Sequence, residues 1–193
     1  MSARLGTLAL LLLAALALYG MQRSTPRYLD LTGPIVERGA MGEAVRTRQF
    51  DATVQRVQFA RQLRYRSLGR ERVRETAGVW AIVWVRLAAL DASTQVGEAA
   101  WLGPDALTYR HTDRLGLAPG VPPYMLDPGL PRTVRLVFEL RPDQARGATL
   151  LLSQRYSPRL DSQARIALDD VPVAADGRPE TVASHDLDQD AIP

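Results

Sequence analysis

The sequence contains no cysteine, no lysine and no asparagine, and it has only two histidines among its 193 residues. Without cysteine the chain can form no disulfide, no thiolate metal site and no nucleophilic thiol. All 24 basic residues are therefore arginine. Because this usage is most simply explained by a coding bias, part of the arginine content is background and carries no functional information.

Motifs for catalysis and cofactor binding are also missing. The sequence holds no G-x-S-x-G, no H-E-x-x-H and no glycine-rich phosphate loop. His111 precedes Asp113 in an H-T-D triplet that could pair an imidazole with a carboxylate, but no nucleophile accompanies them. Asp186, Asp188 and Asp190 have the spacing of a calcium loop without its glycine and distal glutamate. We therefore expect no enzyme, no cofactor and no metal site.

The composition is that of a folded domain with one core. Hydrophobic residues make up 46% of the chain and charged residues 23%, which is typical of a globular protein of this length. The net charge is only +3, but residues 23–86 hold thirteen arginines and six acidic residues, whereas residues 169–193 hold seven acidic residues and one arginine. A chain with so small a net charge is not expected to bind nucleic acid.

The N-terminus carries the one long apolar run. Residues 5–21 are 17 residues without a charge, at the short end of the roughly 17 to 25 residues that cross a bilayer. Ala15 and Ala17 form an A-x-A site at which a secretory signal could be cleaved, but the apolar run continues past Tyr19. We expect residues 1–22 to be a signal-anchor helix, or a signal whose cleavage near Ala17 releases a secreted domain.

The orientation of such a helix is argued from its flanks. Arg4 competes with Arg23, Arg27 and Arg38, and the positive-inside count alone favours a cytoplasmic C-terminus. A short positive segment with a small-residue exit is nevertheless typical of exported chains. We therefore predict a single-pass protein of the cytoplasmic membrane with its domain outside the cytoplasm.

From residue 29 onward, short apolar runs separated by glycine and proline predict an all-β domain. The apolar phase slips by one residue between Val54 and Val57, which is typical of a β-bulge. Residues 78–90 (GVWAIVWVRLAAL) are apolar at both parities, which predicts a central strand covered on both sides. Further strands are expected within residues 101–115, 132–140, 147–154 and 164–169.

Seven or eight strands at this spacing predict a β-sandwich that spans residues 29–168. Residues 23–28 would form a short polar linker between the N-terminal helix and this domain. Residues 169–193 are acidic, and we expect them to be a disordered tail.

Residues 116–131 contain five prolines and predict a long surface loop without regular structure. Within this loop Tyr124, Met125 and Leu126 are apolar residues between turn signals. They could anchor a partner at one end of the sandwich. The alternative is that they pack beneath their own loop.

Five arginines stand within the eleven residues RYRSLGRERVR; they are Arg64, Arg66, Arg70, Arg72 and Arg74. Apolar residues at odd positions on either side indicate a hairpin whose odd positions face the core. Guanidinium groups bind phosphate in a planar, bidentate manner, so an anionic lipid, an anionic envelope polymer or an acidic protein would suit this segment. An ordinary solvated hairpin, or an acidic tail that folds back on it, needs no partner.

Two hairpin registers are open. A three-residue loop that ends at Gly69 would place Arg66 opposite Arg70, and this like-charge pairing calls for an anion. A two-residue loop would pair Arg66 with Glu71 instead and remove the conflict, although it sets Tyr65 against an arginine on the inward side.

Three segments carry a family resemblance: GEAVRTRQFDATVQRVQFA (42–60), GVWAIVWVRLAAL (78–90) and RTVRLVFELRPDQARGATLLLS (132–153). In this order they resemble a group of small exported or membrane-anchored bacterial domains of unknown function, related to a secreted mycobacterial antigen family. The resemblance covers residues 30–168 and implies an immunoglobulin-like sandwich. No catalytic residues are established for the group, so it implies none here.

The sequence thus predicts an all-β, immunoglobulin-like sandwich behind an N-terminal helix, acting as a non-catalytic binding or assembly module outside the cytoplasm. Its partners would be the membrane, through residues 5–21, and another membrane or envelope protein. The alternative is a peripheral binder of anionic lipid or envelope polymer that uses the arginine-rich hairpin.

Overall fold

The computed structural model describes residues 2–24, 31–115, 122–155 and 160–189, and the chain divides into two compact units. The first unit, Met1–Gly33, is built on helix α1, Ser2–Ser24. The second unit, Pro34–Pro193, holds all the strands of the described residues. Most of the predicted linker lies outside the described ranges.

Helix α1 contains the uncharged run, and its described leucines are exposed. These exposed residues are Leu10, Leu11, Leu12, Leu13, Leu16 and Leu18. No helix among the described residues has the length and hydropathy that a membrane crossing requires. The structure therefore gives no support to the anchor predicted for residues 1–22.

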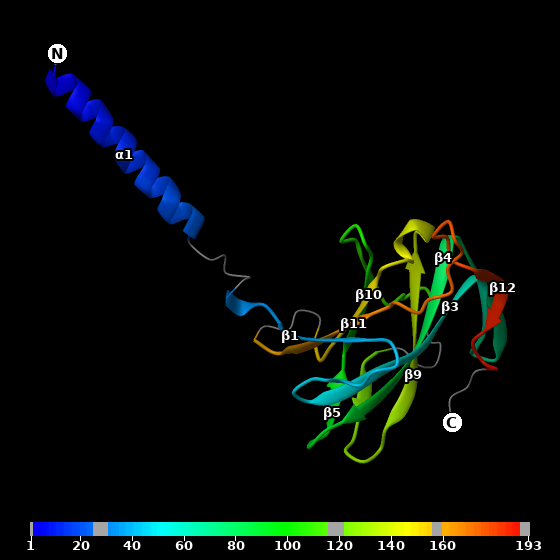
Figure 1. The fold of residues 1–193 in the computed structure, drawn as a ribbon. Coiled ribbons are helices and arrows are strands. Elements are labelled where there is room, and N and C mark those ends of the chain that lie inside the picture. The colour runs from blue at the N-terminus through cyan, green and yellow to red at the C-terminus, as the bar shows by residue number, and fades with distance from the viewer. Residues whose placement is uncertain (1, 25–30, 116–121, 156–159, 190–193) are drawn as a thin grey trace. The chain divides into compact units, whose positions relative to one another are not determined.

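Twelve strands in the described part of the chain form three sheets (Figure 1). The first sheet has the order β1-β11-β10-β6-β7. Its strands are β1 Ile35–Ala40, β11 Ser162–Ala167, β10 Thr149–Ser153, β6 Glu98–Leu102 and β7 Thr108–Arg110. The pairing of β1 with β11 is parallel, whereas the other pairings in this sheet are antiparallel.

The second sheet has the order β12-β3-β4-β9, with β2 paired to the start of β3. Its strands are β12 Thr181–Asp186, β3 Phe50–Ser67, β4 Arg70–Ala89, β9 Arg132–Leu140 and β2 Val45–Arg46. Strand β12 lies parallel to β3, and the other pairs are antiparallel. The third sheet pairs β5, Thr94–Val96, with β8, Tyr124–Leu126.

The two large sheets pack face to face, as the aromatic contacts between them show. Trp101 of the first sheet is fully buried, and its ring centroid lies 6.1 Å from that of Phe59 and 6.0 Å from that of Phe138, both in the second sheet. Its Nε1 donates a hydrogen bond of 2.9 Å to the carbonyl of Gln144. Because the inner faces of both sheets supply one core cluster, the fold class is a β-sandwich, as predicted.

Two strand predictions are confirmed in detail. Strand β4 lies between β3 and β9, and it is buried on both faces from Val79 to Val85. Its odd-numbered residues join the core between the sheets, and Trp80, Ile82 and Trp84 join a second cluster on the outer face. The bulge predicted from the slipped apolar phase is present as a register shift between Val54 and Arg56.

A second irregularity in the pairing of β3 with β4 separates the hairpin from the sandwich. Between Ala60 and Gln62 the register shifts so that one β3 residue, Arg61, lies opposite the four β4 residues 76–79. Before the shift Phe59 faces the inner core, whereas after it Leu63 belongs to the outer cluster. The apolar odd positions of β3, Val57, Phe59, Leu63 and Tyr65, are therefore buried as predicted, but against two different faces of the sheet. On β4 the prediction is wrong for Val73, which is exposed.

The acidic tail corrects one prediction. Residues 169–193 were expected to be disordered, but Thr181–Asp186 form strand β12 at the edge of the second sheet. Leu187 follows the strand and is buried in the outer cluster. Its backbone N–H donates to the carbonyl of Arg64, which extends the pairing toward the hairpin. An apolar side chain beneath the tail supplies the stabilisation that the acidic composition did not indicate.

Two further expectations need correction. The proline-rich segment 116–131 was expected to lack regular structure, yet it contains β8, which pairs with β5. The strands outnumber the seven or eight expected because several of them are only two or three residues long. Such short pieces leave no periodicity in the sequence. The immunoglobulin-like form of the sandwich stays a prediction.

The order of the tail can be tested by mutation. Leu187→Ala should lower the free energy of unfolding by about 2–4 kcal/mol, because it removes a buried side chain from the outer cluster. Val182→Ala, on the strand that precedes Leu187 and more exposed, is the control and should cost less than about 1 kcal/mol. Urea unfolding of both variants checks this, and equal costs would show that the tail does not pack.

Candidate anion-binding surfaces

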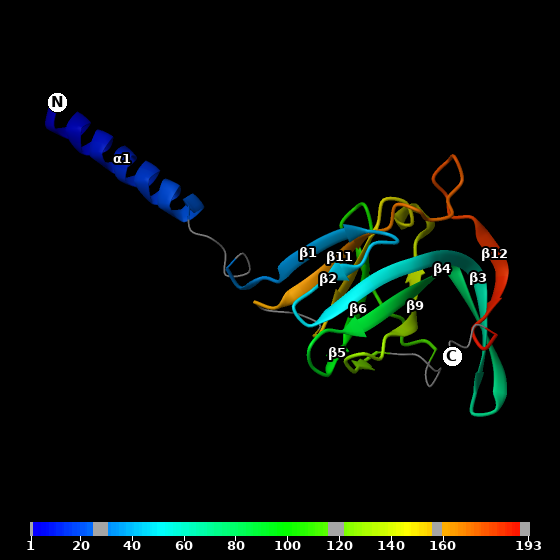
Figure 2. The ribbon, with the colours of Figure 1, turned by 60° about the horizontal axis from the view of Figure 1, so that its bottom comes forward.

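The arginine-rich hairpin adopts the two-residue loop. Leu68 and Gly69 form its tip with φ angles of 52° and 74°, as in a type I′ turn. Arg66 lies opposite Glu71, and Ser67 lies opposite Arg70. This register removes the like-charge pairing that would by itself have called for an anion. Figure 2 shows the hairpin extending beyond the other strands of its sheet.

The structure brings the five predicted arginines together on one ribbon but spreads them over both of its faces. Cross-strand pairing puts Arg72 on the same face as Tyr65. The side chains of four of the arginines form no hydrogen bond or ion pair within the described residues. These four are Arg64, Arg66, Arg70 and Arg72; they are exposed and are called the hairpin arginines below. Arg74 differs, because its Nε donates to the carbonyl of Arg114.

Two aspartates of the tail bind backbone N–H groups, one on the hairpin and one on the tail itself, and neither bonds to a hairpin guanidinium group. Asp188 Oδ2 accepts a 2.7 Å hydrogen bond from the backbone N–H of Arg66. Asp186 Oδ1 accepts one of 2.9 Å from the N–H of Asp188. The tail thus folds back on the hairpin, as one of the alternatives proposed, and among the described residues it forms no ion pair with the hairpin arginines. Asp190 lies outside the described residues.

The tip of the hairpin holds an exposed leucine in a costly conformation. Leu68 is 83% exposed and has a positive φ. A left-handed conformation costs a residue with a Cβ about 1 kcal/mol, which is why asparagine or glycine usually occupies this turn position. An exposed apolar side chain adds no folding energy that would offset this cost. Strained residues of this kind are often found at functional sites.

The predicted loop contact is largely wrong. Tyr124 and Leu126 are buried at 2% and 1% exposure within the inner core, and only Met125 is exposed. The Tyr124 hydroxyl donates to the carbonyl of Arg135, and burial raises the pKa of Tyr124 well above its usual value. Because alternate residues of a strand point to opposite sides, β8 fills the core with two of the three side chains.

His111 lines a separate pocket of about 300 Å³ near the ion pair of Arg110 with Glu98. Burial lowers the pKa of His111 to about 4, so its imidazole is neutral at pH 7. Among the described residues no hydrogen bond joins His111 to Asp113, the carboxylate two residues away. The H-T-D triplet thus forms no imidazole–carboxylate pair in this structure.

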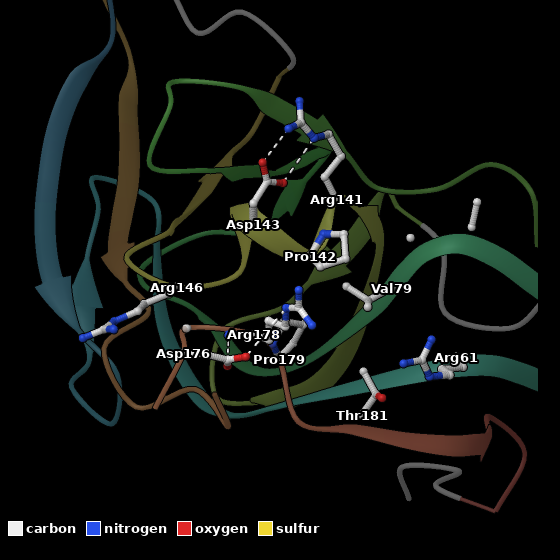
Figure 3. A pocket seen from close by; sticks show the side chains of 13 residues that line it. Arg61, Val79, Arg141, Pro142, Asp143, Arg146, Asp176, Arg178, Pro179 and Thr181 are labelled. Carbon is white, nitrogen blue, oxygen red and sulfur yellow. Dashed lines mark hydrogen bonds and ion pairs between the residues drawn. The ribbon is translucent and has the colours of Figure 1, made fainter. Parts of the chain in front are cut away.

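The structure also forms a cleft that the sequence did not indicate. The cleft has a volume of about 890 Å³ and opens beside the irregular pairing of β3 with β4 (Figure 3). Four arginines and two aspartates line it; they are Arg61, Arg141, Arg146, Arg178, Asp143 and Asp176. Arg141 binds Asp143 through two hydrogen bonds, and Arg178 Nε lies 3.7 Å from Asp176 Oδ2. Arg61 and Arg146 have no such partner in the described part of the chain.

The residues that line this cleft come from several separate segments of the sequence. Its arginines come from the middle of β3, from the turn after β9 and from the turn before β12. Each turn has one arginine close to an aspartate, in RPD (141–143) and DGR (176–178). Such signals are common at turns, so only the pairing of β12 with β3, which is remote in sequence, reveals the convergence.

No protein-family model matches the sequence, and no curated protein matches it. Two solved structures are similar. An uncharacterised β-sandwich protein from Clostridium difficile 630 has 10% identity and a TM-score of 0.48, and the match covers 75% of this chain and all of that one. The yjhA protein from Bacillus subtilis has 12% identity and a TM-score of 0.46, with 66% of this chain and 99% of that one covered. Likenesses this weak carry no argument about function.

The buried imidazole predicts a pH dependence of stability. Because the pKa of His111 is about 4 in the folded chain and about 6.5 when unfolded, only the unfolded chain takes up this proton between those values. Folding stability from this group is therefore complete above pH 6.5 and is lost as the pH falls toward 4, by about 2 kcal/mol at pH 5. His111→Gln should remove that loss in urea unfolding at pH 5 and pH 7.5. An NMR titration of the imidazole near pH 6.5 would contradict the prediction.

Proposed function

We propose that this protein is a non-catalytic binding module that attaches to anionic lipid surfaces through the tip of its β3–β4 hairpin. This proposal takes up the peripheral binding role that the sequence left as an alternative. The observation that carries it is the exposed Leu68 in a strained conformation between the hairpin arginines. The chemistry is that of interfacial membrane binding, in which an apolar group enters the acyl boundary and cations contact the headgroups.

The arrangement of charge supports a surface partner. The hairpin arginines lie on both faces of the ribbon around its tip, so a membrane approached by Leu68 would be met by guanidinium groups on each side. Each arginine held near an anionic bilayer contributes about 1 kcal/mol. Because the hairpin extends beyond its sheet (Figure 2), the rest of the sandwich does not obstruct the tip.

The main prediction from the sequence, a protein-assembly module, has lost one of its two candidate contact surfaces. It relied on Tyr124, Met125 and Leu126 as a second contact surface, and two of these residues fill the core. Location outside the cytoplasm stays part of our proposal and rests on the sequence of residues 1–22. The exposed leucines of α1 would add a second apolar element to a lipid surface, and stable attachment generally needs two such signals.

Removing the hairpin charges should weaken binding to anionic vesicles at least tenfold, because each of the four arginines contributes favourable electrostatic energy at the surface. The variant changes Arg64, Arg66, Arg70 and Arg72 to glutamine. Sedimentation measures the binding of the wild type and of the variant to mixed vesicles of phosphatidylglycerol and phosphatidylcholine. For each protein, the same measurement with vesicles of pure phosphatidylcholine separates the electrostatic contribution from apolar binding by α1. The preference of the wild type for anionic vesicles should also fall with added salt.

The matched control changes four exposed arginines elsewhere to glutamine, and these are Arg38, Arg86, Arg132 and Arg155. Both variants have the same net charge, so only the position of the arginines differs. If the two variants lose anionic binding equally, the hairpin is not the contact surface. If the wild type shows no preference for anionic vesicles, the proposed function is wrong.

Substitution of the tip residue should separate function from folding. Leu68→Asn places Asn-Gly in a turn where both φ angles are positive, the sequence that this turn prefers. We expect the free energy of unfolding to stay the same or rise by up to about 1 kcal/mol, while binding to anionic vesicles weakens several-fold. Thermal unfolding and the same sedimentation assay measure the two effects. A variant that binds as tightly as the wild type would show that Leu68 does not enter the bilayer.

A further inference from the structure

A second site of different shape lies where the regular pairing of β3 with β4 breaks down. Arg61 and three of the four β4 residues opposite it, residues 77–79, line the cleft described above. Bulges and irregular pairings are common next to functional sites because they redirect side chains. Here the irregularity releases Arg61 from the strand ladder and turns it toward a concave surface (Figure 3).

The cleft has a positive charge that its own acidic residues do not balance. Four arginines and two aspartates line it, so the formal balance is two positive charges. Asp143 engages Arg141 at both Nε and Nη2. By contrast, Asp176 is 3.7 Å from Arg178, a distance that leaves that guanidinium able to turn toward a ligand. Neither Arg61 nor Arg146 has an ion pair among the described residues.

Buried hydrogen bonds on the core side hold the turn that contains Arg141 and Arg146. Gln144 is fully buried, and its Nε2 donates a 2.6 Å hydrogen bond to Asp105 Oδ2. The indole of Trp101 donates to the Gln144 carbonyl. A binding surface fixed in this way loses little conformational entropy when a ligand arrives.

The opposite walls are also fixed by backbone contacts. The turn before β12 is closed by hydrogen bonds from Ala174 N to Arg178 O and from Gly177 N to Ala174 O. On β4, a Cβ on Gly78 would lie 2.1 Å from the carbonyl of Leu140. Only glycine therefore permits the close approach of β4 and β9 at this wall.

The spacing of the arginines indicates the shape of the ligand. Figure 3 shows the guanidinium groups of Arg61, Arg141, Arg146 and Arg178 spread around the cleft, with none gathered at a single point. A lone phosphate could contact only one or two of them. An extended ligand with several anionic groups could contact more, and each guanidinium offers a bidentate fork for phosphate or sulfate. The volume is within the range of ordinary ligand pockets.

We propose that this cleft binds an extended oligoanion, a chain with phosphate or sulfate groups repeated along it, through Arg61 and Arg146 with Arg178 completing the contact. The site is separate from the hairpin and does not depend on the function proposed for it. A polyphosphate and a sulfated oligosaccharide share this chemistry, and the experiment below distinguishes them.

The test is calorimetric titration of the full chain at low salt with three probes: inorganic tripolyphosphate, a heparin-derived oligosaccharide and inorganic phosphate. The hairpin variant, with its four arginines changed to glutamine, is the parent so that the hairpin does not contribute. We expect at least one of the two oligoanions to bind tenfold or more tightly than phosphate. The oligoanion that binds more tightly shows whether the ligand is a polyphosphate or a sulfated oligosaccharide.

In this parent, the double variant Arg61→Gln and Arg146→Gln should lose at least tenfold in affinity, whereas Arg38→Gln with Arg155→Gln should lose less than threefold. Asp143→Asn, which removes a competitor for Arg141, should bind several-fold more tightly, so the proposal does not depend on loss of binding alone. Thermal unfolding checks that each variant is folded. Equal affinities for the two double variants, or no oligoanion binding by the parent, would overturn the proposal. Vesicle binding of the wild type reports on the hairpin independently.

Discussion

The irregular pairing of β3 with β4 at Arg61 is the constraint on which both candidate surfaces depend. Up to Ala60 the two strands belong to the sandwich, and Phe59 packs into the core between the sheets. Beyond Gln62 the ribbon is turned so that Leu63 packs on the outer face of the same sheet. One irregularity therefore ends the sandwich, starts the hairpin and leaves Arg61 beside the cleft.

Because the hairpin leaves the sandwich, other contacts must hold it. The outer cluster does this at its base, where Tyr65 and Trp80 pack with Leu187 from the tail. Strand β12 adds backbone hydrogen bonds along β3 as far as Arg64. These contacts stop before the turn, so within the described ranges it is the pairing of the flanking strands that keeps Leu68 in its strained conformation. Under the proposed function, the free energy of binding at the tip offsets the conformational strain of Leu68.

The sequence predicted those features of the fold that the spacing of buried apolar residues determines. Residues 78–90 are apolar at both parities and form the central strand, and the phase slip after Val54 marks a real bulge. The irregularity at Arg61 left no such mark, because Phe59 and Leu63 have the same parity and are both buried. A pattern of burial records that a side chain is covered but not which face of the sheet covers it. The same limit hid the role of Leu187, because most residues of the outer cluster that it joins lie more than a hundred positions earlier in the sequence.

The two candidate surfaces differ in how their arginines can be used. At the hairpin the charges lie on a projecting ribbon and are exposed, so salt screens them strongly and a broad anionic surface can meet them from either face. In the cleft the charges stand on fixed turns around a hollow, and Asp143 already occupies two donors of Arg141. A ligand there must reach several separated guanidinium groups at once, and it gains most if its anionic groups are themselves spaced along a chain. Position in the fold, more than the number of arginines, therefore determines what each surface can bind.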